Sequence, residues 1–262
     1  MRKLAETILV AAVPAIVMAA TAAHASAQEP NFGRAIVATE ADLFVGQPVN
    51  WYGPGVVYTY RRDASGEWQE ASRLVASDSS RKDDFGRSLA VDGNTLIVGA
   101  PRKRDGSGVA YVFERASDAA AWRQVAIIEP PAEGDHSEYA SSLSLSGGDL
   151  LIGAPAVDST GVVYHFSRAG GTWSLHNVIR PASPVGVAGF GRTLSQQGDW
   201  LLVGAPAADS GTGAVFISRR TADGGWGEPR AVSVPRGVAG ARAGVGAAVL
   251  LDGDRAYVGA PG

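Results

Sequence analysis

One pattern of apolar and polar positions recurs along the chain and predicts short antiparallel strands. An apolar residue four positions after an aromatic one marks a first strand, and a short apolar run ending in Gly marks a second. Tight turns such as Asp92-Gly93-Asn94 separate the two, because Gly supplies the positive φ that a hairpin turn needs. The second strand, as in Leu96-Ile97-Val98, is apolar at every position, which predicts that both of its faces are covered.

Two further strands complete each unit. The third follows another Gly and carries aromatic residues two positions apart, as at Tyr111 and Phe113, which places both rings on one face. The fourth follows a polar turn and begins near a Trp. An aliphatic residue stands six positions after that Trp, as Ile128 does after Trp122, and alternation predicts that the two share a face.

The unit repeats about every 53 residues, which is the spacing of repeat proteins built from one supersecondary element. Each repeat contains a Gly, usually in Gly-Ala-Pro, and an aromatic or aliphatic landmark stands fourteen residues before it. The glycines are Gly46, Gly99, Gly153, Gly204 and Gly259, and the landmarks are Phe32, Phe85, Tyr139, Phe190 and Val245. The predicted repeats are 32–84, 85–138, 139–189, 190–244 and a partial repeat, 245–262.

These repeats predict an all-β protein. One four-stranded sheet cannot bury its own apolar faces, whereas a series of such sheets packed face to face can. Four antiparallel strands per repeat, with recurring Gly and aromatic positions, favour a β-propeller of four-stranded antiparallel blades. Four full blades and one hairpin would form an incomplete arc, with the small residues of Gly-Ala-Pro where neighbouring blades come close. A linear stack of sheets is the alternative architecture.

The landmarks also carry a family resemblance, over residues 32–262. The sequence resembles the FG-GAP repeat, in the short-turn form of its bacterial branch. The residues that carry the resemblance are Phe85-Gly86-Arg87-Ser88-Leu89, Val98-Gly99-Ala100-Pro101 and Gly108-Val109-Ala110-Tyr111-Val112-Phe113. That repeat builds the N-terminal seven-bladed propeller of integrin α chains and many bacterial exported proteins. The resemblance therefore implies an extracellular binding or adhesion scaffold, and we expect this chain to be the N-terminal fragment of a longer protein.

Calcium-binding members of that family insert an Asp/Asn-rich loop between the first two strands. Here the corresponding connection is only two to four residues long, too short to gather the six to eight oxygen ligands that calcium takes. The chain has no cysteine, which excludes disulfides and Cys-ligated zinc. We therefore expect no cofactor and no metal site in these repeats.

The N-terminal residues have the features of a secretory signal peptide over residues 1–27. Arg2 and Lys3 precede an apolar, Ala-rich run, and Ala25-Ser26-Ala27 has the small residues of a cleavage site. A retained N-terminal anchor is the alternative. Beyond this segment no apolar stretch is long enough to predict membrane insertion. We expect residues 28–262 to be secreted, periplasmic or displayed at the cell surface.

The net charge and the candidate catalytic residues limit the classes of function that the sequence allows. The formal net charge of −3 disfavours nucleic acid as a partner. The histidines lack metal-ligand spacing and no Ser stands in a G-x-S-x-G turn, so we predict no catalytic residues and no enzyme in this region. The one compact basic cluster is Arg102, Lys103 and Arg104. These residues are candidates for binding an acidic partner, with solvated surface as the alternative.

The prediction that follows is an exported, non-enzymatic scaffold that binds an extracellular protein or glycan. Binding would use the loops at one end of the blades, where the sequence varies between repeats. Two alternatives remain open. The propeller could be the accessory domain of a secreted enzyme whose catalytic domain lies beyond residue 262, or an architectural component of the cell surface.

Overall fold

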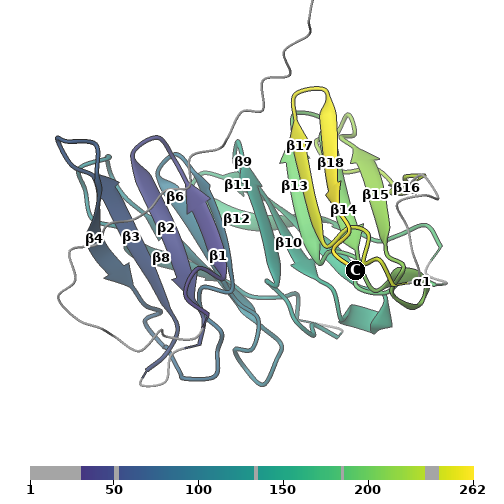
Figure 1. Cartoon of the computed structure of the whole chain (residues 1–262), viewed down its shortest axis with the longest axis horizontal. Coiled ribbons are helices and arrows are strands. Elements are labelled where there is room, and N and C mark those ends of the chain that lie inside the picture. The colour runs from purple at the N-terminus through teal and green to yellow at the C-terminus, as the bar shows by residue number, and fades with distance from the viewer. Residues whose placement is uncertain (1–30, 50–52, 133–134, 184–185, 234–241) are drawn as a thin grey trace, which may run out of the picture.

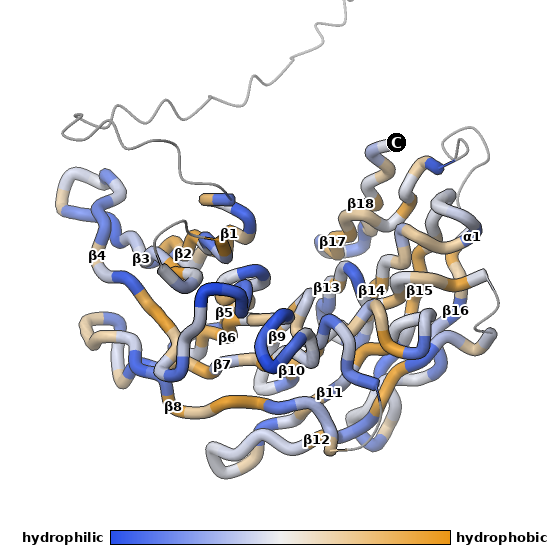
Figure 2. Tube along the Cα trace, turned by 90° about the horizontal axis from the view of Figure 1, so that it is seen from below, coloured by the Kyte–Doolittle hydropathy of each residue, from blue (hydrophilic) through white to orange (hydrophobic). Residues whose placement is uncertain are grey.

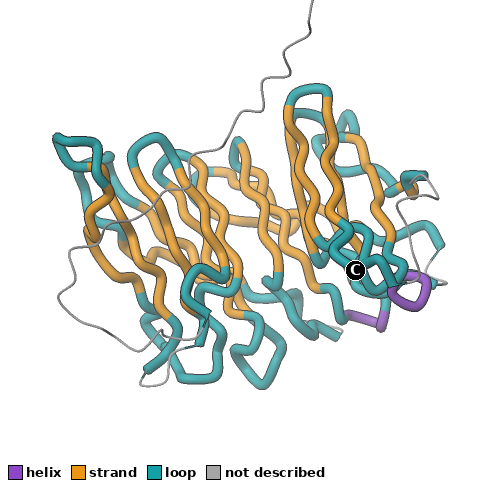
Figure 3. The backbone as a smooth tube through the Cα atoms, in the orientation of Figure 1, coloured by secondary structure: helices purple, strands orange, loops and turns teal. Residues whose placement is uncertain are grey.

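The computed structural model describes residues 31–49, 53–132, 135–183, 186–233 and 242–262. Strands and their connections make up nearly all of this part of the chain (Figure 3). Two very short helices, η1 (Val157–Ser159) and α1 (Ala208–Gly211), lie in its loops. The predicted signal peptide lies outside the described residues.

Four antiparallel meanders and one hairpin follow one another along the chain. The first two sheets contain β1 (Ala35–Ala38), β2 (Asp42–Gln47), β3 (Val56–Arg62), β4 (Trp68–Leu74), β5 (Ser88–Asp92), β6 (Thr95–Ala100), β7 (Val109–Glu114) and β8 (Arg123–Ile128). The next two contain β9 (Ser142–Ser146), β10 (Asp149–Ala154), β11 (Val162–Ala169), β12 (Thr172–Ile179), β13 (Thr193–Gln197), β14 (Trp200–Ala205), β15 (Ala214–Arg219) and β16 (Arg230–Ala231). The hairpin pairs β17 (Ala248–Asp252) with β18 (Arg255–Gly259). The predicted four-stranded antiparallel blades are confirmed.

The blades follow one another as an open arc, an incomplete β-propeller (Figures 1 and 2). Contacts between blades run chiefly through the first strands, which adjoin one another in the order β1, β5, β9, β13 and β17. The first strands therefore form the inner edge of the arc, and each blade extends outward from them to its fourth strand.

The blades have two different ends. The turns between the first and second strands and between the third and fourth strands lie at one end, which we name the turn end. The connections between the second and third strands, and those between blades, lie at the opposite end, which we name the loop end. In Figure 1 the β17–β18 turn points upward and α1 lies near the bottom, on the loop end.

The predicted tight turns are present at the turn end. Asp92 pairs with Thr95 across a two-residue turn, so the connection from β5 to β6 is as short as the sequence indicates. Between β9 and β10 the two turn residues are Gly147 (φ 59°) and Gly148 (φ 86°), both in the left-handed region that Gly enters without strain.

Apolar cores fill the spaces between successive blades. Phe85 is fully buried between the first two blades, where its ring meets Tyr111 edge-on with ring centroids 5.4 Å apart. Phe113 approaches the same ring at 6.0 Å, so the prediction that the two third-strand aromatics share a face is confirmed. Tyr139 and Phe190 are buried in the same way in the next two cores.

The prediction that Trp122 and Ile128 share a face is wrong. A register shift in the β7–β8 pairing leaves Val125 as one extra residue in β8. A bulge of this kind reverses the alternation beyond it. Trp122 therefore packs into the core shared with the first blade, and Ile128 into the core shared with the third.

The fourth blade departs from the other three in its outer strand. Its β16 is only two residues long, pairing with β15 at Phe216 and Ile217. Val232, which the sequence places on a fourth strand with a buried aliphatic position, is exposed. The pattern thus predicts a longer strand than this blade forms.

Small residues lie where blades approach, as predicted. A Cβ on Gly153 would overlap both the main-chain oxygen of Gly191 in the next blade and the hydroxyl of Ser142. Gly99 and Gly204 face the next blade in the same way. The main chain of the residue after each of these landmarks is therefore packed against the Gly of the preceding Gly-Ala-Pro.

Candidate functional site

The three basic residues singled out from sequence do not form one free surface. Each contacts a different carboxylate of the protein itself. The pairs are Arg102 Nε to Asp84 Oδ2 at 3.3 Å, Lys103 Nζ to Asp83 Oδ2 at 2.8 Å, and Arg104 Nη2 to Glu129 Oε1 at 2.6 Å. The hydrogen bond from Arg104 holds the pKa of Glu129 below its usual range.

Lys103 is the most enclosed of the three, with 12% of its side chain exposed. Its ammonium lies between Asp83 and Asp78, and Asp78 also accepts a hydrogen bond from the hydroxyl of Tyr111 at 2.7 Å. Lys103 therefore fixes the loop between β6 and β7 to the segment before Phe85. Arg102 and Arg104, with 72% and 49% of their side chains exposed, are the members of the cluster that solvent and partners can reach.

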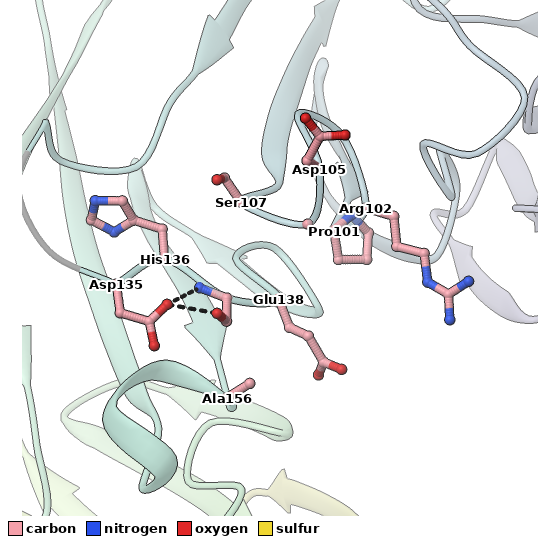
Figure 4. Close-up of a pocket in the computed structure, with 10 residues that line it drawn as sticks. Pro101, Arg102, Asp105, Ser107, Asp135, His136, Glu138 and Ala156 are labelled. Carbon is pink, nitrogen blue, oxygen red and sulfur yellow. Dashed lines mark hydrogen bonds between the residues drawn. The ribbon is translucent and has the colours of Figure 1, made fainter.

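A groove of about 510 Å³ opens beside this loop at the loop end (Figure 4). Most of its lining comes from two segments, the β6–β7 loop with Arg102, Asp105 and Ser107, and the stretch that precedes β9, with Asp135 to Glu138. Ala156, in the β10–β11 loop, completes it. The groove thus spans two successive blades, and acidic, basic and hydroxyl side chains line it.

Hydrogen bonds hold the second wall of the groove in shape. Asp135 Oδ1 accepts from the main-chain N–H of Ser137 at 3.0 Å and from its hydroxyl at 2.6 Å, which keeps the pKa of Asp135 below its usual range. His136 Nδ1 lies 3.4 Å from the hydroxyl of Tyr164. Among the described residues no partner reaches His136 Nε2, although this atom is buried.

The first wall has an unusual backbone. Arg104 (φ 54°) and Asp105 (φ 57°) are consecutive residues in the left-handed region, which is uncommon for residues other than Gly. Asp158 and Asp209 occupy the equivalent place in the next two blades and have positive φ as well. Asp tolerates this conformation better than most residues, which supports a turn-forming role for this recurring Asp.

Next to the groove, toward the inner edge of the arc, lies a smaller cavity of about 40 Å³. It shares Pro101, Arg102 and Glu138 with the groove. The residues that complete its lining are Asp84, Arg87, Ser141 and Arg192. Sequence reasoning missed Arg87 and Arg192, although both stand two residues after a landmark, as Arg34 also does.

The described residues contain no group of three or more His, Asp or Glu side chains placed to hold a metal ion. The turn between Asp92 and Thr95 is two residues long, too short to gather the six to eight oxygen ligands that calcium takes. Neither helix in the described part of the chain has the length or apolar character needed to cross a bilayer.

Comparison with known protein families identifies one of the repeats. The model of the FG-GAP repeat matches residues 68–113, which run from β4 to β7 and include the Phe85 landmark and Gly99. The chain carries an FG-GAP repeat. A search of curated proteins found no match.

A solved structure resembles the arc only loosely. It is the crystal structure of a protein from Lactobacillus plantarum, 14% identical in sequence, with a TM-score of 0.48. The match covers 74% of this chain and 54% of that protein, so this chain spans about half the length of the structure it matches.

At the turn end, the four repeats share an arginine that does not stand out from its sequence context. It stands seven residues after the Gly that precedes the third strand, and its guanidinium lies over the Trp of its own blade. The pairs are Arg62–Trp68 at 4.8 Å, Arg115–Trp122 at 4.7 Å, Arg168–Trp173 at 5.7 Å and Arg220–Trp226 at 4.6 Å, measured to the ring centroid. Such contacts combine apolar packing with cation–π attraction.

Three of these arginines also reach a carboxylate of the preceding blade. Arg115 Nη1 contacts Asp42 Oδ2 at 2.5 Å, Arg168 Nη2 contacts Glu114 Oε1 at 2.5 Å, and Arg220 Nη2 contacts Asp149 Oδ2 at 2.6 Å. These contacts join successive blades at the turn end. The signal in the sequence is the fixed spacing of the arginine, which recurs in all four repeats.

Proposed function

We propose that this FG-GAP propeller is an exported, non-enzymatic binding scaffold whose partner, an extracellular protein or glycan, docks in the groove between the second and third blades. The observation that carries the proposal is the groove itself. It is wide enough for a side chain or a sugar ring, it spans two blades, and its walls combine Asp105, Arg102 and Ser107 with Asp135. Mixed donors and acceptors of this kind orient a polar ligand.

The frame around the groove supports binding without large rearrangement. Lys103 ties one wall to the β5 side of its blade, and Asp135 ties the other through Ser137. A rigid frame reduces the entropy lost when a partner binds. Export is supported by residues 1–27, whose charge and apolar pattern are those of a signal peptide.

Substitution at the groove tests the binding. Ser107→Trp places a large ring in the groove, whereas Ser117→Trp adds the same ring at the exposed turn end of the same blade. The labelled mature protein is applied to arrays of purified glycans and extracellular proteins. We expect the native protein and Ser117→Trp to bind the same probe, and Ser107→Trp to lose at least tenfold in affinity. Equal binding by both variants, or no probe bound by the native protein, would refute the groove as the docking site.

Fractionation of a Gram-negative host that expresses the full chain tests export. We expect the protein in the periplasm or medium, shortened at its N-terminus, and deletion of residues 2–27 to leave it in the cytoplasm. Cytoplasmic retention of the full chain would contradict the proposed location.

A further inference from the structure

An arginine recurs near the inner edge of the arc, at the loop end. Two residues after the landmark stand Arg34 in the first blade, Arg87 in the second and Arg192 in the fourth, with Ser141 at the same place in the third. Each lies just before or at the start of a first strand, and first strands are the elements that adjoin from blade to blade. The fold therefore gathers these side chains at one level, around the inside of the arc.

The charges in this cluster do not balance. Arg102 Nε contacts Asp84 at 3.3 Å, and Arg192 Nη1 contacts Glu138 at 3.0 Å, which accounts for both carboxylates of the cavity. Within the described part of the chain, neither Arg34 nor Arg87 forms an ion pair. Four guanidinium groups thus stand against two carboxylates, in a protein whose formal net charge is −3.

Arg87 shows the consequence most clearly. It is partly buried, and its pKa is lowered first by burial and then by repulsion from Arg34, Arg192 and Arg102, while attraction from Asp84 acts in the opposite direction. Asp84 is in direct contact with Arg102 and not with Arg87, and a partly buried cation without an ion-pair partner recovers only part of the hydration that it loses. An anion in the cavity would restore the balance.

We propose that the cavity at the inner edge binds a multivalent oxyanion, held by Arg87 and Arg192, with Arg34 of the first blade adding positive charge and the hydroxyl of Ser141 as a further donor. Guanidinium groups match this chemistry, because each presents several N–H donors in one plane to the oxygens of a sulfate, phosphate or carboxylate group. The cavity adjoins the groove, but Arg87, Ser141 and Arg192, which would hold the anion, do not line the groove. The anion site can be present or absent whatever becomes of the proposed function.

Titration calorimetry on the purified chain, at low and constant ionic strength, tests the proposal. Sulfate, phosphate and citrate are the probes, and chloride is the reference. We expect one anion per chain to bind saturably, and Arg87→Gln to weaken binding at least tenfold, which corresponds to about 1.4 kcal/mol. Arg123→Gln, on the outer strand β8 and exposed, removes the same charge far from the inner edge and should leave affinity unchanged.

Two further comparisons keep the test decisive. Circular dichroism reports whether Arg87→Gln folds; if it does not, Arg34→Gln, which alters an exposed side chain, replaces it, with at least a threefold loss expected. Binding of citrate alone would assign the site to polycarboxylates, and binding of sulfate and phosphate would assign it to tetrahedral anions. The proposal is overturned if none of the three binds more tightly than chloride, or if the cluster variant and Arg123→Gln bind equally well.

Discussion

The loop end and the turn end join the same blades by different means. At the loop end, the closest contact between neighbouring full blades is made in the same way each time: a Gly lies against the main chain beside the next landmark, and no side chain fits between them. At the turn end, the Arg–Trp pair is constant, but the carboxylate that the arginine reaches comes from a different place in different blades. Close main-chain packing allows only Gly at the contact, whereas an arginine can form its ion pair with carboxylates at different positions.

The middle blade pair shows how the partner changes. Asp42 and Asp149 stand at the start of the second strand in the first and third blades, and Thr95 occupies that position in the second. Arg168 there turns to Glu114, at the end of β7, and its Nη1 lies 3.3 Å from the Thr95 hydroxyl. The ion pair is retained because a nearby strand supplies the missing carboxylate.

The largest effect is expected at the loop end. Gly153→Val should lower the free energy of unfolding by more than about 3 kcal/mol, because its side chain overlaps the Gly191 carbonyl and the blades must separate to admit it. Gly53→Val is the matched control, since a Cβ there meets nothing within 4 Å. Denaturant unfolding of both variants measures the difference. A native-like midpoint for Gly153→Val would refute the close packing of these blades.

At the turn end, the expected loss is somewhat smaller. Asp42→Ala should cost about 2–3 kcal/mol, because it leaves the guanidinium of Arg115, only 2% exposed, without its buried counterion. Arg115 retains Asp118 and Asn94, which limits the loss. Asp118→Ala removes an exposed partner of the same arginine and should cost less than about 1 kcal/mol. Equal losses in the two variants would mean that burial of the pair does not matter.

A hydrogen bond at the loop end should contribute less to the free energy of unfolding than the Gly153 packing or the Asp42 ion pair. The Ser142 hydroxyl donates to the Gly191 carbonyl at 2.6 Å, and both groups are buried. Ser142→Ala should destabilise by about 1 kcal/mol, measured by thermal melting, because the carbonyl loses its donor while the packing is kept. Exposed Ser146→Ala is the control, and a melting temperature no lower than that of this control would contradict the assignment.

The smallest effect expected is none. Because the turns from β5 to β6 and from β9 to β10 are only two residues long, too short to gather the oxygen ligands of calcium, a chelator such as EDTA should leave the melting temperature unchanged. The melt is recorded with and without added calcium. A reproducible fall in melting temperature with chelator, reversed by calcium, would reveal an ion site and add a metal to the contacts that distinguish the two ends.

The sequence predicts the repeat, the strand order and the close approach at Gly153, because each leaves a periodic trace in residue type. It does not predict the bulge at Val125, because a spacing of six between Trp122 and Ile128 also suits an unbroken strand. The three arginines at the inner edge are visible as equivalent positions. Their proximity, however, depends on how the blades curve around an axis, and no spacing along the chain expresses that.

The groove could not be predicted from the sequence for a similar reason. Arg102 and Asp105 stand in a recognisable loop, but the opposite wall at Asp135 comes from the stretch that joins two blades, and only the fold brings the two together. Pairing of Arg102, Lys103 and Arg104 with separate carboxylates was equally hidden, since Asp83 and Glu129 are distant from them in the chain.

The extra residue in the fourth strand has a consequence for how such a protein can be divided. Because the bulge at Val125 turns the two halves of β8 toward different neighbours, Trp122 belongs to one core and Ile128 to the next. A recombinant module cut inside this strand would separate two cores that the strand spans. Designed arrays of these repeats should therefore be joined in the loop-end connections, because a junction there leaves the fourth strand intact.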